Sequence, residues 1–284
     1  LEADRVKMMD TLAVEKENFE KLLATFEADV AKCKTFSDYE AMEANFGEVD
    51  GLMNNIEAAE KQAENFNMRE KVFGQPPTEY PSLIACKKEV SPFHKLWTFV
   101  SEFHTSRQDW LHGSFVDLNA NEIDEQVTNW WKTSYKMSRD LEDETPGAAE
   151  CAQKLRAVTT EFREHLPVIR SLASKALKDR HWEEISVKMS SPGEELHIEP
   201  DDELTLNWLL EIHIDEHIEE IQEVCVAAEK QYGLEKNLEA MKMEWNIIEF
   251  IVKEYKETGT CVVGGVDEII TLLDDHIVKT QTMR

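Results

Sequence analysis

The chain has 284 residues, which suits one large domain or two small ones, and it contains only 10 glycines and 8 prolines. That is about half the average share of these two turn-forming residues, so the composition predicts long helices rather than a β-sandwich or barrel. With 31 Lys and Arg against 58 Asp and Glu, the formal net charge is −27. Such a charge excludes a nucleic-acid-binding protein that works by neutralising phosphates, and it argues against binding to anionic membranes.

The five cysteines lie far apart in the sequence, with no C-x-x-C pair. The sequence therefore predicts neither a disulfide framework nor a zinc ribbon, and this cysteine usage is typical of a reducing, intracellular compartment. No apolar run approaches the length of a membrane-spanning helix, and no signal peptide is recognisable. Because the first residue is Leu1 rather than Met, we expect the chain to be a piece of a longer protein.

Residues 1–73 are expected to form a helical hairpin or bundle. Ser37 and Glu40 match the capping-box pattern S-x-x-E, which predicts that a second helix starts there, and Gly74 with the two prolines after it should end that helix. The apolar residues recur at steps of three and four, the spacing of one helix face. They are Phe19, Leu22, Phe26, Val30 and Cys33, then Met42, Phe46, Val49, Met53 and Ile56.

Residues 80–189 are expected to form a second helical bundle. Asn119 and Glu122 offer another helix cap, and Pro167 should kink or restart its helix. The predicted buried stripes again follow helical spacing. They are Phe93, Leu96, Trp97, Val100 and Phe103; Ile123, Val127, Trp130, Met137 and Leu141; Leu155, Val158, Phe162, Leu166, Ile169 and Leu172; and Leu177, Trp182, Ile185 and Met189.

Residues 194–284 form the third expected part, and it follows an S-S-P-G loop. No Lys or Arg occurs between Met189 and Glu229. A long helical pattern then runs from Ile214 to Ile248, and Gly233 is expected to bend or split it. These boundaries predict a mainly α fold: an elongated series of helical bundles, with one small β-hairpin near the C-terminus.

The hairpin is predicted at about 248–263, where two β-prone runs flank a four-residue turn that contains Gly. Asp267 is expected to cap a last helix. Ile270, Leu273 and Ile277 of that helix are expected to face inward.

Three segments could carry chemistry, and each has a simpler structural explanation. Residues 259–264 satisfy G-x-x-x-x-G, but Gly265 and Val266 stand where a phosphate-binding loop needs Lys and Ser or Thr. His213 and His217 have the i, i+4 spacing of zinc ligands on one helix face, with Glu216 beside them. The pattern is not H-E-x-x-H, however, and a solvated acidic helix face is the simpler interpretation.

The acidic run 194–203 lacks the order of a calcium-binding loop, so a solvated loop is the simpler interpretation. No serine or cysteine has the sequence context of a catalytic nucleophile. From its residues alone the chain is therefore expected to be a non-catalytic helical scaffold. It could be a mechanical segment of a larger protein or a free-standing adaptor that binds partners through its helix faces, and a metal-dependent enzyme would require zinc at the two histidines.

Several separated stretches resemble, in the same order, the linker region of dynein heavy chains. The matching stretches are residues 73–80 (FGQPPTEY), 96–104 (LWTFVSEFH), 110–118 (WLHGSFVDL), 176–185 (ALKDRHWEEI), 255–260 (YKETGT), 265–269 (GVDEI) and 273–283 (LDDHIVKTQTM). The last stretch is more similar to axonemal heavy chains, of inner-arm type, than to cytoplasmic ones. The resemblance covers residues 70–284, and residues 1–70 fit the preceding tail bundle by pattern.

The resemblance implies a mechanical role in a minus-end-directed microtubule motor that drives ciliary or flagellar beating. The linker of such motors is a helical arm that changes angle during the ATP cycle and passes the movement of the AAA+ ring to the tail. No cofactor is implied for this segment, because ATP and Mg²⁺ would bind in the ring downstream. The implied partners are that ring, dynein intermediate or light chains, neighbouring heavy chains and, through the rest of the chain, microtubules of the axoneme.

Within the resemblance, one signature and two hinges are the candidate functional residues. The linker signature consists of Leu177, Asp179, Arg180, His181 and Trp182, and we expect it to form a packing junction between tail and arm with Trp182 buried. The candidate hinges lie in segments 74–81 and 190–203. Their residues are Gly74, Pro76, Pro77, Pro192 and Gly193.

Overall fold

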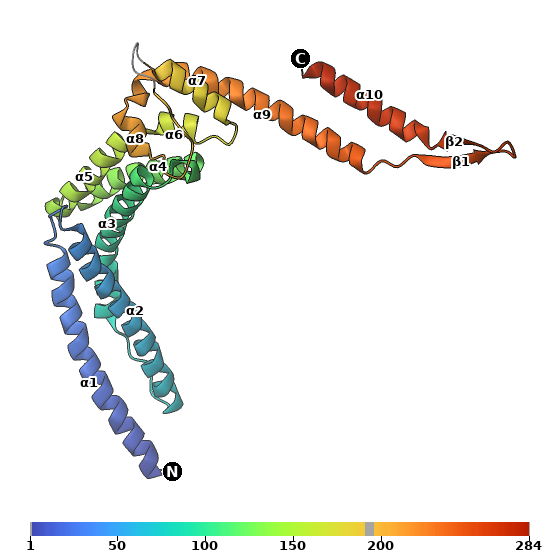
Figure 1. The fold of residues 1–284 in the computed structure, drawn as a ribbon. Helices are drawn as coiled ribbons and strands as arrows, with labels where there is room; N and C mark the ends of the chain where they lie inside the picture. Colours follow the sequence, from blue (N-terminus) through green and yellow to red (C-terminus); the bar gives the residue numbers. More distant parts are fainter. Residues whose placement is uncertain (1, 191–195, 284) are drawn as a thin grey trace. The chain divides into compact units, whose positions relative to one another are not determined.

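The computed structural model describes residues 2–190 and 196–283, and most of them are helical (Figure 1). The predicted mainly α fold with one hairpin near the C-terminus is confirmed. The helices are α1 (Glu2–Cys33), α2 (Met42–Val72), α3 (Pro81–His112), α4 (Ala120–Leu141), α5 (Pro146–Arg163), α6 (Leu166–Leu172), α7 (Asp179–Met189), α8 (Leu206–Glu211), α9 (Ile218–Asn246) and α10 (Val266–Thr282), with short 3₁₀ turns η1 (Phe115–Asp117) and η2 (Ile214–His217) and strands β1 (Ile251–Tyr255) and β2 (Thr260–Gly264).

The residues separate into two compact units. The first unit contains residues 1–170 and 202–212, and the second contains residues 171–201 and 213–284. That residues 1–73, 80–189 and 194–284 act as three separate parts stays a prediction.

In the first unit, α1 and α2 pack against each other and against α3. Phe19 of α1 joins them, because its ring lies edge-on to Phe66 of α2, with 5.4 Å between centroids, and to Tyr80 before α3, with 5.0 Å. The predicted stripes of this region are largely buried, as expected from their spacing. Leu22 is an exception: it is exposed, and its neighbour Leu23 is buried instead.

The two ends of α2 differ in how well the sequence predicts them. The predicted start at Ser37 is wrong: α2 begins at Met42, and its N-cap residue Ala41 makes no side-chain cap. The backbone carbonyl of Ser37 accepts a hydrogen bond from Cys151 Sγ. The end is confirmed, because Gly74 has φ 75° and its N–H donates to the carbonyl of Lys71. Since that φ strains any residue with a Cβ, glycine suits this Schellman-type ending.

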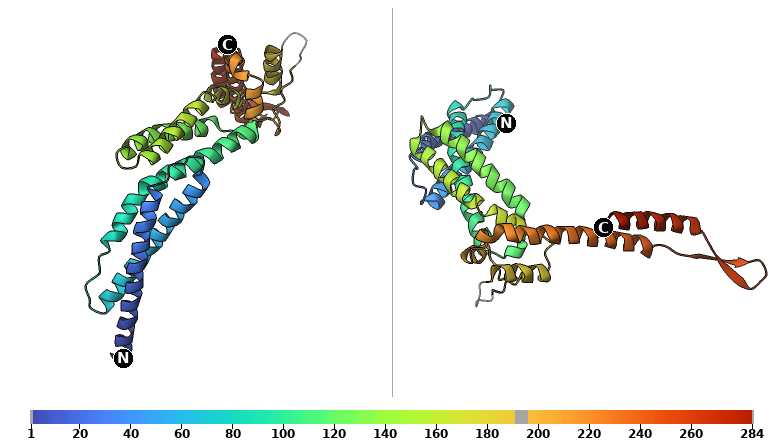
Figure 2. Two further views of the ribbon diagram at one scale, coloured as in Figure 1. Left: turned by 90° about the vertical axis from the view of Figure 1, so that its left-hand side faces the viewer. Right: turned by 90° about the horizontal axis from the view of Figure 1, so that it is seen from above.

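The second half of α3 packs with α4, α5 and α8 in the same unit (Figure 2). Phe103 of α3 lies edge-on to Trp130 of α4 at 5.5 Å and to Phe162 of α5 at 6.2 Å. The predicted cap of α4 is confirmed, since the Asn119 side chain accepts hydrogen bonds from two backbone N–H groups of the first turn. The restart at Pro167 is also confirmed, because α5 ends at Arg163 and α6 begins at Leu166.

In the second unit, α7 packs against the first half of α9. After α9 the chain forms an antiparallel hairpin in which Tyr255 of β1 pairs with Thr260 of β2. Lys256 (φ 49°) and Gly259 (φ 69°) make the turn, and α10 returns beside α9 (Figure 1, and right-hand view of Figure 2).

Three details of the second unit differ from the sequence-based expectation. The helix predicted from Ile214 begins at Ile218, because the preceding four residues form the 3₁₀ turn η2. Gly233 lies inside one continuous helix rather than splitting it. Asp267 does not cap α10: it lies in the first turn, and Gly265, with φ 73°, is the N-cap residue.

The predicted inward face of α10 is also wrong. Ile270, Leu273 and Ile277 are 52%, 46% and 46% exposed. All five residues of β1 and the first four of β2 are exposed as well. Their spacing placed the α10 residues on one face correctly, but no described part of the chain covers that face.

Candidate functional site

The signature predicted from the sequence lies where α7 packs on α9. Trp182 is 4% exposed and Ile185 is fully buried, so the predicted burial of Trp182 is confirmed. The facing half of α9 contributes a buried stripe of its own, which contains Ile221, Val224, Cys225 and Ala228. Leu177, just before α7, is half-buried. This α7–α9 junction is the small hydrophobic core of the second unit.

His181 fixes the start of α7 and links it to α9. Its Nδ1 accepts a hydrogen bond from the backbone N–H of Lys178 at 3.1 Å, so the proton of the neutral ring sits on Nε2. That Nε2 lies 3.1 Å from Oε1 of Gln231 on α9 and donates to it. Arg180 donates to the same oxygen at 2.6 Å. Two signature residues therefore meet one amide of the facing helix.

A cluster of charges borders the same junction. Lys178 and Arg180 both pair with Glu235 of α9, the second at 3.6 Å. The hydrogen bond from Lys178, together with the positive charge of Arg180, holds the pKa of Glu235 below its usual range. At the other end of α7, Lys188 lies 3.7 Å from Glu223. Asp179 adds a negative charge in the first turn of α7, where the helix dipole favours it.

The segment after α7 is tied back to that helix by two serines. The backbone N–H of Ile198 donates to Ser186 Oγ at 3.0 Å, and that of Leu196 donates to Ser190 Oγ at 3.0 Å. Ile198 is 2% exposed. Of the candidate hinge at 190–203, Pro192 and Gly193 lie outside the described residues, and a hinge role for this segment stays a prediction.

The other candidate hinge, segment 74–81 in the first unit, is attached to α2 through Thr78. Pro76 and Pro77 lie in the extended loop after Gly74. Thr78 follows them, and its backbone N–H donates to Glu70 of α2 at 2.8 Å, while its hydroxyl donates to the same carboxylate at 2.7 Å. A hinge motion of this loop, which stays a prediction, would have to release Thr78.

Glu70 is the centre of that attachment. It is 2% exposed and also binds Lys16 of α1. Burial alone would raise the pKa of Glu70, but the hydrogen bonds from Lys16 and Thr78 more than offset it, so the pKa lies below its usual value.

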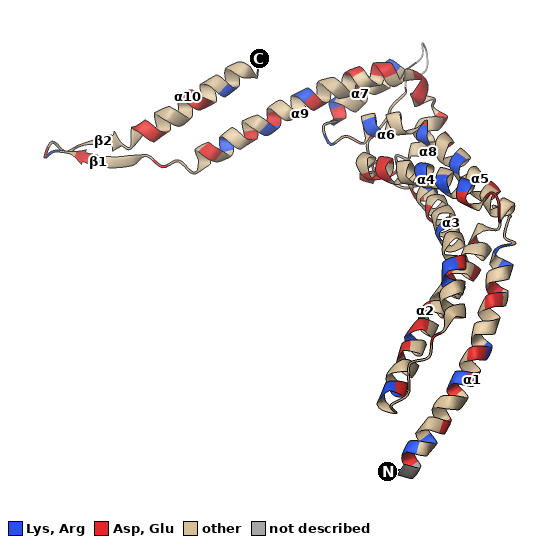
Figure 3. Cartoon of the chain, turned by 180° about the vertical axis from the view of Figure 1, so that it is seen from behind, with Lys and Arg blue, Asp and Glu red and all other residues tan. Residues whose placement is uncertain are grey.

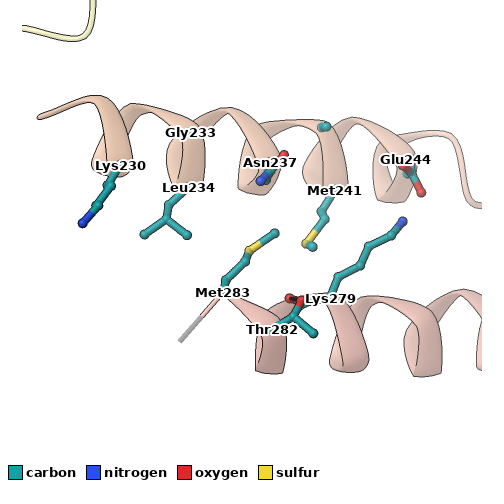
Figure 4. A pocket seen from close by; sticks show the side chains of 10 residues that line it. Lys230, Gly233, Leu234, Asn237, Met241, Glu244, Lys279, Thr282 and Met283 are labelled. Atoms are coloured by element: carbon teal, nitrogen blue, oxygen red, sulfur yellow. Dashed lines mark hydrogen bonds between the residues drawn. The ribbon is translucent and has the colours of Figure 1, made fainter. Parts of the chain in front are cut away.

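The far half of α9 meets α10 through a buried histidine. His276 of α10 is 5% exposed, and its Nδ1 accepts a hydrogen bond from Trp245 Nε1 at 2.9 Å. Its Nε2 lies 3.0 Å from a carboxylate oxygen of Glu244 and donates to it. Beside this contact an open groove of about 830 Å³ lies between the two helices, and Met241 and Met283 point into it from opposite sides (Figure 4).

The residues considered for catalysis or metal binding do not assemble. His213 has φ 58° and the next four residues are 3₁₀, so the expected single helix face for His213 and His217 is wrong. Each lies 3.9 Å from one carboxylate, Glu216 and Glu220 respectively. Across residues 2–190 and 196–283, no group of three or more His, Cys, Asp or Glu could hold a metal ion. Residues 259–264 are the turn end and β2, as the hairpin interpretation predicts.

The cysteines are free thiols, as the spacing predicted. Burial raises the pKa of Cys33, Cys151 and Cys225 to about 11, so these thiols stay protonated at neutral pH. Only Cys261, on β2, is exposed. In the part of the chain that the structure describes, no helix has the length and apolar character needed to cross a membrane.

Three residues of the junction escaped the sequence analysis: Ser186, Gln231 and Glu235. Ser186 lies inside α7, and nothing in its sequence context indicates that its hydroxyl accepts a hydrogen bond from the backbone of Ile198. Gln231 and Glu235 are one helical turn apart on α9, so they share a face, but nothing in that spacing identifies the cations of α7 as their partners.

A known protein family matches most of this chain. Residues 83–284 match the family described as dynein heavy chain, N-terminal region 2. The chain is 30% identical to human dynein axonemal heavy chain 3 over 282 residues, which is 99% of this chain and 7% of that protein. It is 30% identical to mouse dynein axonemal heavy chain 1 over 280 residues, 99% of this chain and 6% of that protein.

Human dynein axonemal heavy chain 12 is 28% identical over 272 residues, which cover 93% of this chain and 9% of that protein. The chain thus spans less than a tenth of the length of each of these relatives. The matches to the two proteins at 30% identity also cover the region before residue 70, which fits a tail bundle only by its apolar spacing.

Proposed function

The chain belongs to the dynein heavy chain family, as a segment of its N-terminal tail region, and on that premise we propose that it acts mechanically, as tail and linker of an axonemal motor. In this proposal it has no catalysis of its own and passes ATP-driven movement of the AAA+ ring to the tail. The motor would work in the axoneme of a cilium or flagellum, as the names of the relatives indicate. The inner-arm assignment belongs to the same proposal.

The α7–α9 junction is the observation that carries the proposal. It combines a buried Trp182, two hydrogen bonds to Gln231 and a pair of cations on Glu235 within one contact between two helices. Close-packed side chains resist bending, because any change of angle between the helices disturbs many contacts at once. A junction of this kind can transmit force along α9 without a chemical step.

ATP and Mg²⁺ would bind in the ring, outside this segment. The remaining partners in the proposal are intermediate or light chains, neighbouring heavy chains and, through other parts of the heavy chain, microtubules. The free-standing adaptor is the competing hypothesis, and it would make the junction irrelevant to movement.

A charge swap in the full-length motor tests this proposal. Lys178→Glu would break the pair with Glu235, and adding Glu235→Lys would restore this pair in reverse, while Arg180 loses its carboxylate. Lys242→Glu is the matched control, because Lys242 pairs only with its near neighbour Glu239 on the exposed side of α9 among the described residues. We expect Lys178→Glu to slow microtubule gliding while the ATPase rate is kept, and the double variant to recover part of the speed. Unchanged gliding in Lys178→Glu would refute the mechanical role of the junction.

A further inference from the structure

One face of the first unit gathers arginines and aromatic rings without acidic partners. It lies on α4 and α5, the most extensively packed pair of helices in the chain, and Figure 3 shows Lys and Arg recurring along both. We call it the arginine–aromatic face. Its members are Trp131, Tyr135 and Arg139 of α4, and Arg156, Thr160 and Arg163 of α5.

Helical spacing explains why these residues share a face. On α4 they follow one another at steps of four residues, and on α5 at steps of four and three. Such steps place side chains one above the other on the same side of a helix. Two packed helices therefore present two parallel rows, one rich in rings and one rich in guanidinium groups.

The rows interlock by stacking of arginine on aromatic rings. Arg156 Cζ lies 4.3 Å from the ring centroid of Tyr135 and 5.0 Å from that of Trp131. Arg163 Cζ lies 4.6 Å from the Trp131 centroid, and Trp131 Nε1 donates to Thr160 at 3.0 Å. A stacked guanidinium uses its flat face, so the N–H groups along its edge stay available to bind another group.

These arginines contrast with others in the chain. Arg69, Arg170 and Arg180 each pair with a carboxylate. Within the described residues, Arg139, Arg156 and Arg163 form no ion pair, although Asp and Glu outnumber Lys and Arg by 58 to 31. Arg139 donates to the Tyr135 hydroxyl at 3.5 Å, whereas the guanidinium edges of Arg156 and Arg163 would bind a carboxylate supplied from outside in a bidentate manner.

The face also has room for an occupant. Tyr135 is 45% exposed, and beside it a shallow hollow of about 610 Å³ lies between α4 and α5. Arg139, Arg156 and one acid, Glu142, line it. Tyr, Trp and Arg are the residue types that contribute most to binding at protein–protein interfaces.

We propose that the arginine–aromatic face docks an acidic helix of a partner protein. The two guanidinium groups at positions 156 and 163 are seven residues apart, which is about 10 Å along α5. Carboxylates two turns apart on a partner helix have the same separation, and an apolar residue between them would contact Tyr135. A long polyanion such as DNA is disfavoured, because it would extend past the face onto a chain of net charge −27.

A designed peptide tests this proposal with the whole chain. The probe is a synthetic helical peptide that carries Glu residues at i, i+4 and i+7 around one Leu, and the reference is the same peptide with Gln in place of Glu. We expect calorimetric titration to show binding of the Glu peptide and none of the Gln peptide. No binding of the Glu peptide, or equal binding of both peptides, would overturn the proposal.

Variants then assign the binding to the face. Arg156→Gln with Arg163→Gln should weaken the Glu peptide at least about tenfold, since each charge-assisted contact is worth more than a neutral one. The control removes two charges elsewhere: Lys61→Gln with Lys154→Gln, both exposed on α2 and α5, should change affinity little. An equal loss in both variants would mean general charge attraction and would contradict a specific site.

Two further experiments distinguish docking by guanidinium groups from a loss of folding and from general binding of polyanions. Arg156→Lys with Arg163→Lys keeps the charge and should keep the melting temperature, yet it should lose much of the affinity because lysine lacks the planar fork. Full affinity in that variant would overturn docking by stacked guanidinium groups. Equally tight binding of a single-stranded DNA oligonucleotide would show a polyanion site instead.

Discussion

Helix α3 in the first unit and helix α10 in the second both carry apolar stripes at helical spacing, but only the stripe of α3 is covered. On α3, Leu96 and Trp97 are fully buried, while Leu273 on α10 is 46% exposed. The difference arises from the neighbours: α3 has helices packed along its length, whereas α10 returns beside the sparsely packed end of α9. Periodicity shows which residues share a face, and packing decides whether that face is buried.

The same division runs through α9 itself. Its first half is buried against α7, with Ile221 and Ala228 fully buried. Its second half exposes Tyr232, Leu238 and Met243. Within the second unit, the α7–α9 junction therefore resembles the covered helices of the first unit, and the C-terminal hairpin and α10 do not.

The largest expected effect comes from removing the ring at the junction. Trp182→Ala should cost about 3–5 kcal/mol of unfolding free energy, since it deletes a large buried side chain. The same substitution at Trp97 of α3 should cost a similar amount, because both residues are covered. Urea unfolding followed by circular dichroism checks both. A loss of less than about 0.5 kcal/mol in Trp182→Ala would mean that this side chain is not buried at the junction.

A pH-dependent effect is expected at Glu70 in the first unit. Glu70→Gln should cost about 2 kcal/mol at neutral pH, because charge-assisted hydrogen bonds to Lys16 and Thr78 are lost. The folded-state pKa of Glu70 is lowered, so its contribution is complete above the ordinary carboxyl pKa and is lost as pH falls through the folded-state value. The stability difference between wild type and variant should therefore shrink below about pH 4. A difference that stays constant down to pH 3 would contradict this assignment.

A smaller effect is expected at the contact between α9 and α10. His276→Leu should lower the local stability of α10 by about 1 kcal/mol, because Trp245 and Glu244 lose their hydrogen-bond partner. Hydrogen exchange of the α10 amides measures this directly, and the amides of α3 serve as the internal control. Unchanged exchange in α10 would mean that this histidine does not hold the helix in place.

The smallest effect is expected on the uncovered face of α10. Leu273→Ala should change the unfolding free energy by less than about 0.5 kcal/mol, because its side chain is already half exposed to water. The same urea experiment checks it against Leu96→Ala of α3, which should cost about 2–5 kcal/mol. Equal costs at the two leucines would show that α10 is covered in solution.

Much of the fold followed from local sequence signals. The cap at Asn119, the helix end at Gly74, the restart at Pro167 and the hairpin turn were predictable because each depends on a few neighbouring residues. The start of α2 was not: the S-x-x-E pattern predicts a cap at Ser37, but the helix begins at Met42, and the backbone carbonyl of Ser37 contacts Cys151, more than a hundred residues away in sequence.

The candidate site was predictable only in part, for the same reason. The burial of Trp182 followed from its helical spacing, whereas Gln231 and Glu235 became partners of α7 only through tertiary packing. Exposure of α10 likewise depends on what packs beside it, and no local pattern encodes that.

Hydrogen exchange of the whole chain tests most directly whether the α7–α9 junction is the rigid part of the second unit. We expect the amides of α7 and of the first half of α9 to exchange as slowly as those of α3, and the amides of the hairpin and α10 to exchange much faster. If α7 exchanged as fast as the hairpin, the junction could not transmit force, and the mechanical account would be contradicted.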